Sequence, residues 1–380
     1  MEQTWTPIAP GELIASRYRV DAVLGTGGYG SVYRCTDLQL QRDVAVKVLH
    51  SIESTIGREI EGELRDRFAR EARIMGQIQH PNFVQVYDVG TMGRMIFLVM
   101  ELVNGRSLGD ELARGVMTPA RALPLFIDAL QGLGEGHARG VVHKDLKPDN
   151  LLLTRVDGHE RLKLLDFGVA RVVHEDRLTR TGLIVGTPQY FAPEYLTTGL
   201  VSPAVDVYQM ALILIEALAG RPCVPDGLSF IQMCNVHVKG RLEIPIELTA
   251  GDFGYVIRRA TAISAADRYH DAAHFAQALR GIAAESVITP AGVRPASGSR
   301  AAVEHPLRDL IETLPAEAPT EVWGDDTRRE LEKQLAQDRI AADDGVTSRP
   351  SHLKWAVLVA ALIAFGVLAL AAYLAVVQGS

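Results

Sequence analysis

Short β-rich hydrophobic runs dominate the first part of the chain. Each is predicted to be a strand, and they cover residues 18–20, 31–35, 44–49, 83–89 and 95–99. One longer segment, residues 61–78, instead carries apolar side chains at helical spacing, namely Leu64, Phe68, Ala72 and Met75. The pattern therefore predicts a small sheet accompanied by one helix.

The pattern becomes mainly helical beyond Asn104-Gly105, a pair that interrupts the last of these runs. Pro222 and Pro225 mark loops between the predicted helices. These helices cover residues 120–139, 203–219, 253–262 and 272–283. A strand-rich part followed by a helical part is typical of an α+β fold.

The composition changes again near the C-terminus. Residues 286–354 are polar and charged and contain six prolines, so we expect a largely disordered juxtamembrane linker. Residues 355–377 then run for 23 positions without a charged side chain, which is long enough to cross a hydrocarbon core of roughly 30 Å as a helix. We predict a membrane-spanning helix here, with residues 378–380 as a short external tail.

Charged residues beside this segment predict its orientation. Arg339, Arg349 and Lys354 precede it, and positive charge prefers the cytoplasmic side of a membrane. The first residues lack the basic region and apolar run of a cleaved signal peptide. We therefore expect a single-pass protein of the plasma or inner membrane whose long N-terminal part is cytoplasmic.

Overall charge and cysteine content exclude some classes of protein. The formal net charge is −7, whereas a nucleic-acid binder usually carries a basic face, so we expect no nucleic-acid partner. The three cysteines, Cys35, Cys223 and Cys234, form no CxxC pair. They fit ordinary thiols in a reducing compartment better than a disulfide framework or a zinc site.

Four short motifs occur in one order along the chain. They are Gly25-Thr26-Gly27-Gly28-Tyr29-Gly30-Ser31-Val32, Val44-Ala45-Val46-Lys47, His143-Lys144-Asp145-Leu146-Lys147-Pro148-Asp149-Asn150 and Asp166-Phe167-Gly168. Glycines let backbone N–H groups approach phosphates without a Cβ clash. The strand-like run that follows them favours a β-hairpin lid over a dinucleotide-binding turn, and no Gly-Lys-Ser/Thr follows, which excludes a Walker A loop.

The other motifs supply the charged groups that phosphoryl transfer needs. Lys47 offers a cation to phosphates, although alone it also fits a strand lysine whose amine lies in water. Asp145 can accept a hydroxyl proton, and Lys147 can neutralise charge on the transferring group. Asn150 and Asp166 supply oxygens that suit Mg²⁺. A polar turn would explain the third motif, but not the strand-like run directly before Asp166.

From about residue 18 to residue 282 the chain resembles the eukaryotic-type (Hanks-type) protein kinases, particularly the bacterial single-pass membrane Ser/Thr kinases. The resemblance implies a bilobal α+β fold. A β-rich N-lobe would cover residues 18–103 and a helical C-lobe residues 104–285, after an N-terminal extension at residues 1–17. It also implies ATP and Mg²⁺, or Mn²⁺ in its place, as cofactors.

The resemblance also implies roles for individual residues. Asp145 would be the catalytic base, with Lys147, and Glu71 would hold Lys47. The implied metal ligands are Asn150 and Asp166. The implied ATP-binding residues, with Met100 as gatekeeper, are Leu24, Gly25, Gly27, Gly28, Gly30, Val32, Ala45, Lys47, Met100, Glu101 and Val103. The implied structural residues are Thr187, Asp206, which would bond the catalytic-loop backbone, and Arg268, which would pair with Glu194.

Residues 166–194 would form the activation segment. Thr179 and Thr181 match positions that are often autophosphorylated in bacterial relatives, and a phosphate there can order a loop against cations. The alternative is that loops commonly contain threonine. The family usually has arginine where this chain has Lys144, and lysine offers a point charge instead of a two-pronged fork. We therefore expect Lys144 to hold a phosphothreonine less rigidly than arginine would.

We expect a membrane-anchored Ser/Thr kinase that acts on protein substrates in signal transduction and self-associates for trans-autophosphorylation. One alternative is a pseudokinase that binds nucleotide and signals by docking, against which the motif residues are all present. A small-molecule phosphotransferase is a further alternative. The complete segment ending in Ala192-Pro193-Glu194, which would present a peptide platform, argues against it.

Overall fold

The computed structural model describes residues 7–27, 30–49, 69–70, 72–93, 95–165 and 188–290. The chain divides into Met1–Thr320 and Glu321–Ser380, and every described residue belongs to the first unit. The predicted membrane helix, the tail and nearly all of the predicted linker lie outside the described residues. Within those residues, no helix is both long enough and apolar enough to cross a membrane.

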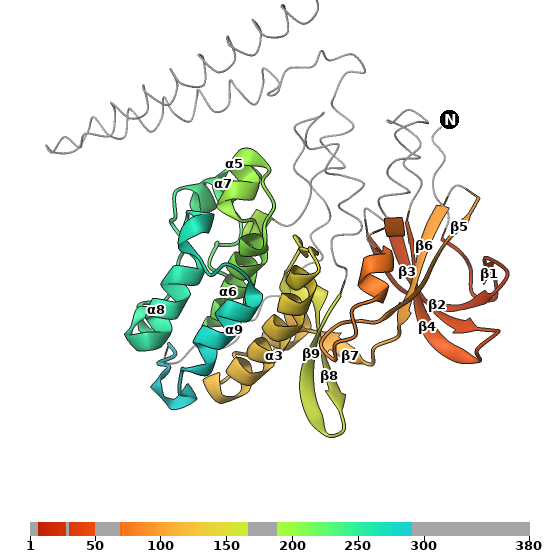
Figure 1. The fold of residues 1–380 in the computed structure, drawn as a ribbon, viewed down its shortest axis with the longest axis horizontal. Coiled ribbons are helices and arrows are strands. Elements are labelled where there is room, and N and C mark those ends of the chain that lie inside the picture. The colour runs from red at the N-terminus through yellow and green to blue at the C-terminus, as the bar shows by residue number, and fades with distance from the viewer. Residues whose placement is uncertain are drawn as a thin grey trace, which may run out of the picture. The chain divides into compact units, whose positions relative to one another are not determined.

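A six-stranded antiparallel sheet forms the N-terminal part of this unit (Figure 1, red to orange). Its spatial order is β1-β2-β3-β4-β6-β5. The strands are β1 (Leu13–Ile14), β2 (Tyr18–Gly27), β3 (Gly30–Asp37), β4 (Arg42–Leu49), β5 (Val86–Met92) and β6 (Met95–Glu101). The predicted sheet is therefore present, and residues 72–76 are helical as expected.

One strand prediction needs correction. The strand expected at residues 83–89 is β5, which begins at Val86 and continues to Met92. Phe83 lies outside the sheet, where it forms an isolated parallel bridge with Leu164 and is almost fully buried in the main core. Phe83 is apolar because it is buried, not because it belongs to a strand. A short hydrophobic run does not distinguish a buried loop from a strand.

Residues ahead of the first predicted strand also pack on the sheet. The Gly11 N–H donates to the Val20 carbonyl at 2.8 Å, and Ile14 is fully buried. The Ile8 N–H donates to the Tyr33 hydroxyl at 3.2 Å. This part of the predicted extension therefore contributes to the core beneath β2 and β3, although no periodicity marks it in the sequence.

A three-stranded sheet and several helices form the C-terminal part. The sheet has the order β7 (Gly105–Ser107), β8 (Leu151–Val156) and β9 (His159–Leu164). The helices are α2 (Leu108–Leu112), α3 (Pro119–Ala138), α5 (Pro193–Thr198), α6 (Pro203–Ala219), α7 (Phe230–Val238), α8 (Gly251–Ala260) and α9 (Ala272–Arg280). Short 3-10 turns connect them, including η1 (Pro148–Asn150), η2 (Pro188–Tyr190) and η4 (Ala265–Asp267).

The four predicted helices are all present as α3, α6, α8 and α9. Their ends differ from the predicted ones by up to three residues, and α9 ends at Arg280 rather than at residue 283. Helices α2 and α5 have only five and six residues, which is too few turns for a period to emerge. Helix α7 has nine residues, as many as α9, and was not predicted. Figure 1 shows α3, α6 and α9 side by side, and the contacts between these helices agree with that view.

Helix α6 forms the centre of the larger core. Nearly all of its side chains are buried, because they are apolar on every face of the helix. Pro203 begins the helix at a position where the missing N–H costs nothing, and Gly220 ends it with a positive φ of 74°. Polar residues on such a helix must be hydrogen-bonded, and two of them face the candidate site.

Candidate active site

Strand β4 carries Lys47 on the same face of the sheet as Ala45. Side chains alternate between the faces of a strand, and the valines of β4 fill the opposite face, where Val44, Val46 and Val48 are fully buried. In the register of the sheet, Lys47 lies directly opposite Val32 of β3 on one side and Leu98 of β6 on the other. The lysine therefore projects from an otherwise apolar face.

Apolar side chains gather on that same face. Ala45, Val84 and Met100 form a small buried cluster, against which four partly buried residues pack: Val32, Leu102, Val103 and Leu165. Four of the residues predicted to bind ATP, namely Val32, Ala45, Met100 and Val103, are brought together here. A partly open apolar cluster of this kind suits the faces of a flat aromatic base such as adenine.

The glycine-rich loop is formed by the end of β2 and the start of β3. Gly30 has no room for a side chain, because a Cβ there would lie 2.3 Å from the Val48 carbonyl oxygen. Gly25 and Leu24 lie on β2, where the Leu24 side chain is exposed. The loop therefore extends from the same sheet that carries Lys47.

Helix α6 holds the backbone of the catalytic loop, residues 143–150. The carboxylate of Asp206 accepts the N–H of His143 at 2.7 Å and that of Lys144 at 2.8 Å. Gln209 lies one turn further along the same face. Its side chain accepts the Leu146 N–H at 3.1 Å and donates to the Lys144 carbonyl at 3.2 Å. Two helix residues thus fix the residues on both sides of Asp145.

His137 of α3 completes the surroundings of Asp206. Its Nε2 donates to Asp206 Oδ2 at 2.9 Å, while its Nδ1 accepts the Ala272 N–H at 3.2 Å. Burial alone would raise the pKa of the Asp206 carboxyl, but the hydrogen bond from His137 and the nearby donors outweigh it, so the pKa lies below its ordinary value. Asp206 is therefore an ionised and fully buried acceptor.

The catalytic loop folds back on itself around Asp145. The Asn150 Nδ2 donates to the Asp145 carbonyl at 2.6 Å and to Asp145 Oδ2 at 3.1 Å, which leaves the amide oxygen as the ligand atom of Asn150. Leu165 is held on both sides: its N–H donates to the Asn150 carbonyl at 2.9 Å, and its carbonyl accepts His143 Nε2 at 2.6 Å. These two bonds hold Leu165 against the loop that carries Asn150.

Lys144, which stands where the family usually has arginine, has a left-handed backbone. Its φ is 69°, a conformation that costs a non-glycine residue roughly 1–2 kcal/mol. The hydrogen bonds from its N–H to Asp206 and from Gln209 to its carbonyl hold the backbone there. The strain is located directly beside Asp145.

An ion pair anchors the end of the predicted activation segment. Arg268 is completely buried at its side chain and contacts both Glu194 oxygens, at 2.8 and 2.7 Å. Its guanidinium also donates to three backbone carbonyls, those of Ala204, Ala262 and Ile263. The start of α5 is therefore tied to α6 and to the segment before η4.

A buried histidine holds the residue that directly follows Thr187. His237 Nε2 donates to the Pro188 carbonyl at 2.9 Å, and Nδ1 accepts the Tyr208 hydroxyl at 2.9 Å. Burial lowers the pKa of His237 to about 4, so the ring is neutral at physiological pH. No motif or pattern in the sequence pointed to His237 or His137. The i, i+3 spacing of Asp206 and Gln209 could have pointed to Gln209.

Several predicted site residues lie outside the described residues: Gly28, Glu71, Asp166, Thr179, Thr181 and Thr187. Their roles stay predictions. The described ones among the predicted site residues form two groups. Val32, Ala45, Met100 and Val103 pack in one apolar cluster on the face of the larger sheet that carries Lys47. Asp145 and Asn150 are hydrogen-bonded to each other.

This arrangement agrees with a known family. Residues 18–254 match the protein kinase domain family, so the chain belongs to it. The chain is 37% identical over 277 residues to the serine/threonine-protein kinase PknL of Mycobacterium tuberculosis, a match that covers 72% of this chain and 67% of PknL. It is 39% identical over 219 residues to pkn2 of Myxococcus xanthus, which covers 56% of this chain but only 26% of that kinase.

The fold agrees as well. The crystal structure of the PknI kinase domain of Mycobacterium tuberculosis superposes with a TM-score of 0.54 at 28% identity, covering 72% of this chain and 99% of that domain. The bilobal α+β kinase fold predicted from the sequence is therefore confirmed. The domain is a bacterial, eukaryotic-type serine/threonine kinase domain, a class that uses ATP and a divalent metal ion.

Proposed function

We propose that the whole chain is a membrane-anchored serine/threonine protein kinase. It would transfer the γ-phosphoryl group of ATP to hydroxyl groups of proteins. The observation that carries the proposal is the catalytic loop around Asp145, which Asp206 and Gln209 of α6 hold by its backbone. Such positioning supplies much of the rate enhancement in phosphoryl transfer, because little covalent chemistry is left for the protein.

The site residues would divide the work as follows. Asp145 orients the acceptor hydroxyl and takes its proton, and Lys147 stabilises the charge that develops on the transferring group. Lys47, steadied by Glu71, holds the phosphates, while the apolar cluster around Ala45 and Met100 holds the adenine. In this scheme Thr187, Asp206 and the Arg268–Glu194 pair keep the loops in place.

Asn150 and Asp166 would hold the divalent ion. Both offer oxygen ligands. The fit is supported because Asn150 uses its Nδ2, and not its amide oxygen, in the bonds to Asp145. Oxygen ligands favour Mg²⁺, with Mn²⁺ as the nearest substitute. When bound, the ion neutralises charge on the phosphate oxygens.

Residues 355–377 would anchor the kinase in the plasma or inner membrane, with the domain in the cytoplasm. The anchor confines the chain to two dimensions and raises its effective concentration near other copies. This supports self-association and trans-autophosphorylation at Thr179 and Thr181. Substrates would then be found among proteins at or near the membrane surface.

The activity is tested by incubating the full-length chain with labelled ATP and Mg²⁺, with Asp145→Asn as the matched variant. We expect label in the wild type alone, mapped to Thr179 or Thr181. If neither protein incorporates label or phosphorylates a generic protein acceptor while nucleotide still binds, the chain is a pseudokinase. Transfer to a small molecule alone would indicate the phosphotransferase alternative.

The anchor is tested by expressing the full-length chain and a chain that ends at Lys354. The full-length chain should remain in the membrane fraction after alkaline extraction, and the shortened chain should be released. Equal release of both proteins would rule out the membrane span without bearing on catalysis.

A further inference from the structure

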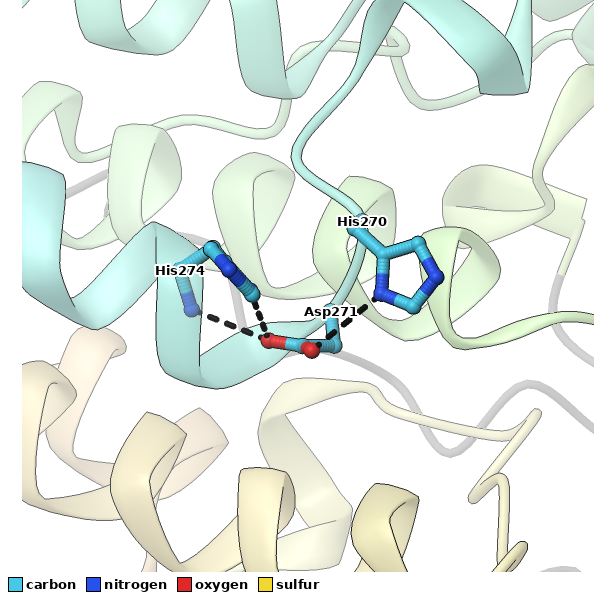
Figure 2. A group of neighbouring side chains, drawn as sticks. All are labelled: His270, Asp271 and His274. Atoms are coloured by element: carbon cyan, nitrogen blue, oxygen red, sulfur yellow. Dashed lines mark hydrogen bonds and ion pairs between the residues drawn. The ribbon is translucent and has the colours of Figure 1, made fainter.

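Three potential metal ligands meet at the start of α9, and none of them belongs to the catalytic loop. His270, Asp271 and His274 each offer one ligand atom, and these atoms all lie within 4.8 Å of one another. Figure 2 shows the two imidazole rings beside the Asp271 carboxylate. A search of the described residues for three or more histidine, cysteine or acidic side chains at metal-ligand spacing finds this group.

The distances in this group suit a metal ion. His270 Nδ1 lies 3.3 Å from Asp271 Oδ2, and His274 Nδ1 lies 2.8 Å from Asp271 Oδ1. With metal–ligand bonds of about 2.0–2.1 Å, neighbouring ligand atoms in octahedral or tetrahedral geometry lie about 2.8–3.4 Å apart. The two histidine–aspartate distances already lie close to these separations.

The backbone that carries these ligands is held firmly. Tyr269 and Ala272 are buried on either side of Asp271, and the Ala272 N–H donates to His137 Nδ1 at 3.2 Å. The Asp271 carboxylate also accepts the His274 N–H at 2.9 Å as the N-cap of α9. A site that is rigid before binding loses less entropy on taking up a ligand.

The imidazole rings themselves are open to solvent. The His270 side chain is 86% exposed and that of His274 is 67% exposed. An ion bound by three protein ligands here would therefore keep positions for water or for a ligand from another molecule. Structural metal sites are usually closed by four protein ligands, whereas sites that bind a further ligand keep such an open position.

The ligand chemistry selects the class of ion. Two imidazole nitrogens favour Zn²⁺ and its neighbours in the first transition row, whereas Mg²⁺ prefers oxygen ligands in a complete octahedron. We propose that His270, Asp271 and His274 form a binding site for a divalent transition-metal ion, represented by Zn²⁺, separate from the nucleotide-bound metal of the kinase reaction.

One physical effect opposes this site. The N-terminus of a helix carries partial positive charge, which disfavours a cation. The site therefore depends on the negative charge of Asp271 in addition to its position. The same distances would also arise from two hydrogen bonds to Asp271 without any ion, so the experiment must separate these two arrangements.

The test titrates Zn²⁺ into the full-length, tag-free chain after chelator treatment, in excess Mg²⁺ and without nucleotide, followed by calorimetry. Three variants each remove one ligand: His270→Ala, Asp271→Asn and His274→Ala. Asp271→Asn is the sharpest, because asparagine also caps helices and so keeps α9 intact while removing the charge. His159→Ala, which removes an exposed histidine on β9, is the matched control.

We expect one zinc ion per chain in the wild type and in His159→Ala, with a melting temperature that rises with zinc concentration. Each ligand variant should bind more than about tenfold more weakly, since even the loss of an outer-shell partner costs that much. Unchanged zinc affinity in Asp271→Asn and both histidine variants would overturn the proposal. So would a wild type that takes up no zinc in excess Mg²⁺.

Discussion

Lys163 of β9 forms an ion pair with Glu101 at the end of β6, and its Nζ lies 2.7 Å from both carboxylate oxygens. The ammonium also lies 3.4 Å from the Phe83 carbonyl. This pair joins the three-stranded sheet to the larger sheet beside the segment predicted to bind adenine. Because the Glu101 side chain is engaged here, any role of this residue in nucleotide binding rests on its backbone.

Breaking this pair from one side should destabilise the kinase domain. Glu101→Ala would leave the Lys163 ammonium, 11% exposed, without its carboxylate. We expect the free energy of unfolding to fall by about 3 kcal/mol, because an unpaired buried charge is costly. Chemical denaturation of the purified chain measures this loss.

Two comparisons make the result specific. The double variant Glu101→Leu with Lys163→Met removes both charges and should recover most of the loss. Glu243→Ala breaks the exposed pair with Arg221 and should cost no more than about 1 kcal/mol. Equal losses in Glu101→Ala and Glu243→Ala would show that burial of the first pair has no energetic consequence.

Removing the charge of Asp206 should disturb catalysis more than nucleotide binding. Asp206→Asn places an amide where the carboxylate accepts from the His143 and Lys144 N–H groups and from His137. At least one donor then faces another donor, and the catalytic loop shifts. We expect kcat to fall about 100-fold, the scale of a misplaced catalytic group, with little change in KM for ATP.

Steady-state kinetics at saturating acceptor would measure this split, with circular dichroism to verify that the variant is folded. The apolar cluster that would hold adenine contains none of these residues. A kcat within twofold of the wild type would show that the carboxylate is dispensable for the loop.

Acidification should destabilise the fold through His237. Burial lowers the pKa of this ring to about 4 in the folded chain, whereas the ordinary value is about 6.5. The unfolded chain therefore binds the extra proton first, and this contribution is complete above about pH 6.5 and is lost as the pH falls toward 4. At 1.36 kcal/mol per pKa unit, the loss is on the order of 3 kcal/mol.

The matched variant is His237→Gln, which keeps a donor for the Pro188 carbonyl but does not titrate. Its free energy of unfolding should fall less steeply than that of the wild type between pH 6.5 and 4. Parallel pH profiles for the two proteins would contradict the assignment, whatever their absolute stabilities.

Arginine should be required at position 268. Arg268→Lys keeps the charge but loses the fork that bonds both oxygens of Glu194, together with donors to backbone carbonyls. We expect a loss of about 3 kcal/mol in the free energy of unfolding. Thermal denaturation measures this loss. Arg221→Lys, at an exposed pair, is the control and should stay within about 0.5 kcal/mol of the wild type.

The helices α3 and α6 were predictable because each buries apolar side chains over several turns, which produces a recognisable local pattern of hydrophobic residues. Helices α2 and α5 were not predictable in this way, since five or six residues contain too few turns for a period, and α7 was not predicted either. The motif residues were predictable for a different reason: phosphoryl transfer needs these side-chain types. The roles of Asp206 and of the Arg268–Glu194 pair came from resemblance to a family, because no spacing in this chain connects them.

The sequence by itself therefore determined the class of fold, the family and the identity of the chemical groups, all of which depend on local pattern or on side-chain type. Only the tertiary structure decided which polar groups meet in the interior. Asp206 and His143 are 63 positions apart, and Lys163 and Glu101 are 62 apart. An unpaired buried charge is costly, so each of these charges lies beside a partner in the folded chain. The partner is supplied by a distant part of the sequence, and no local pattern predicts which part that is.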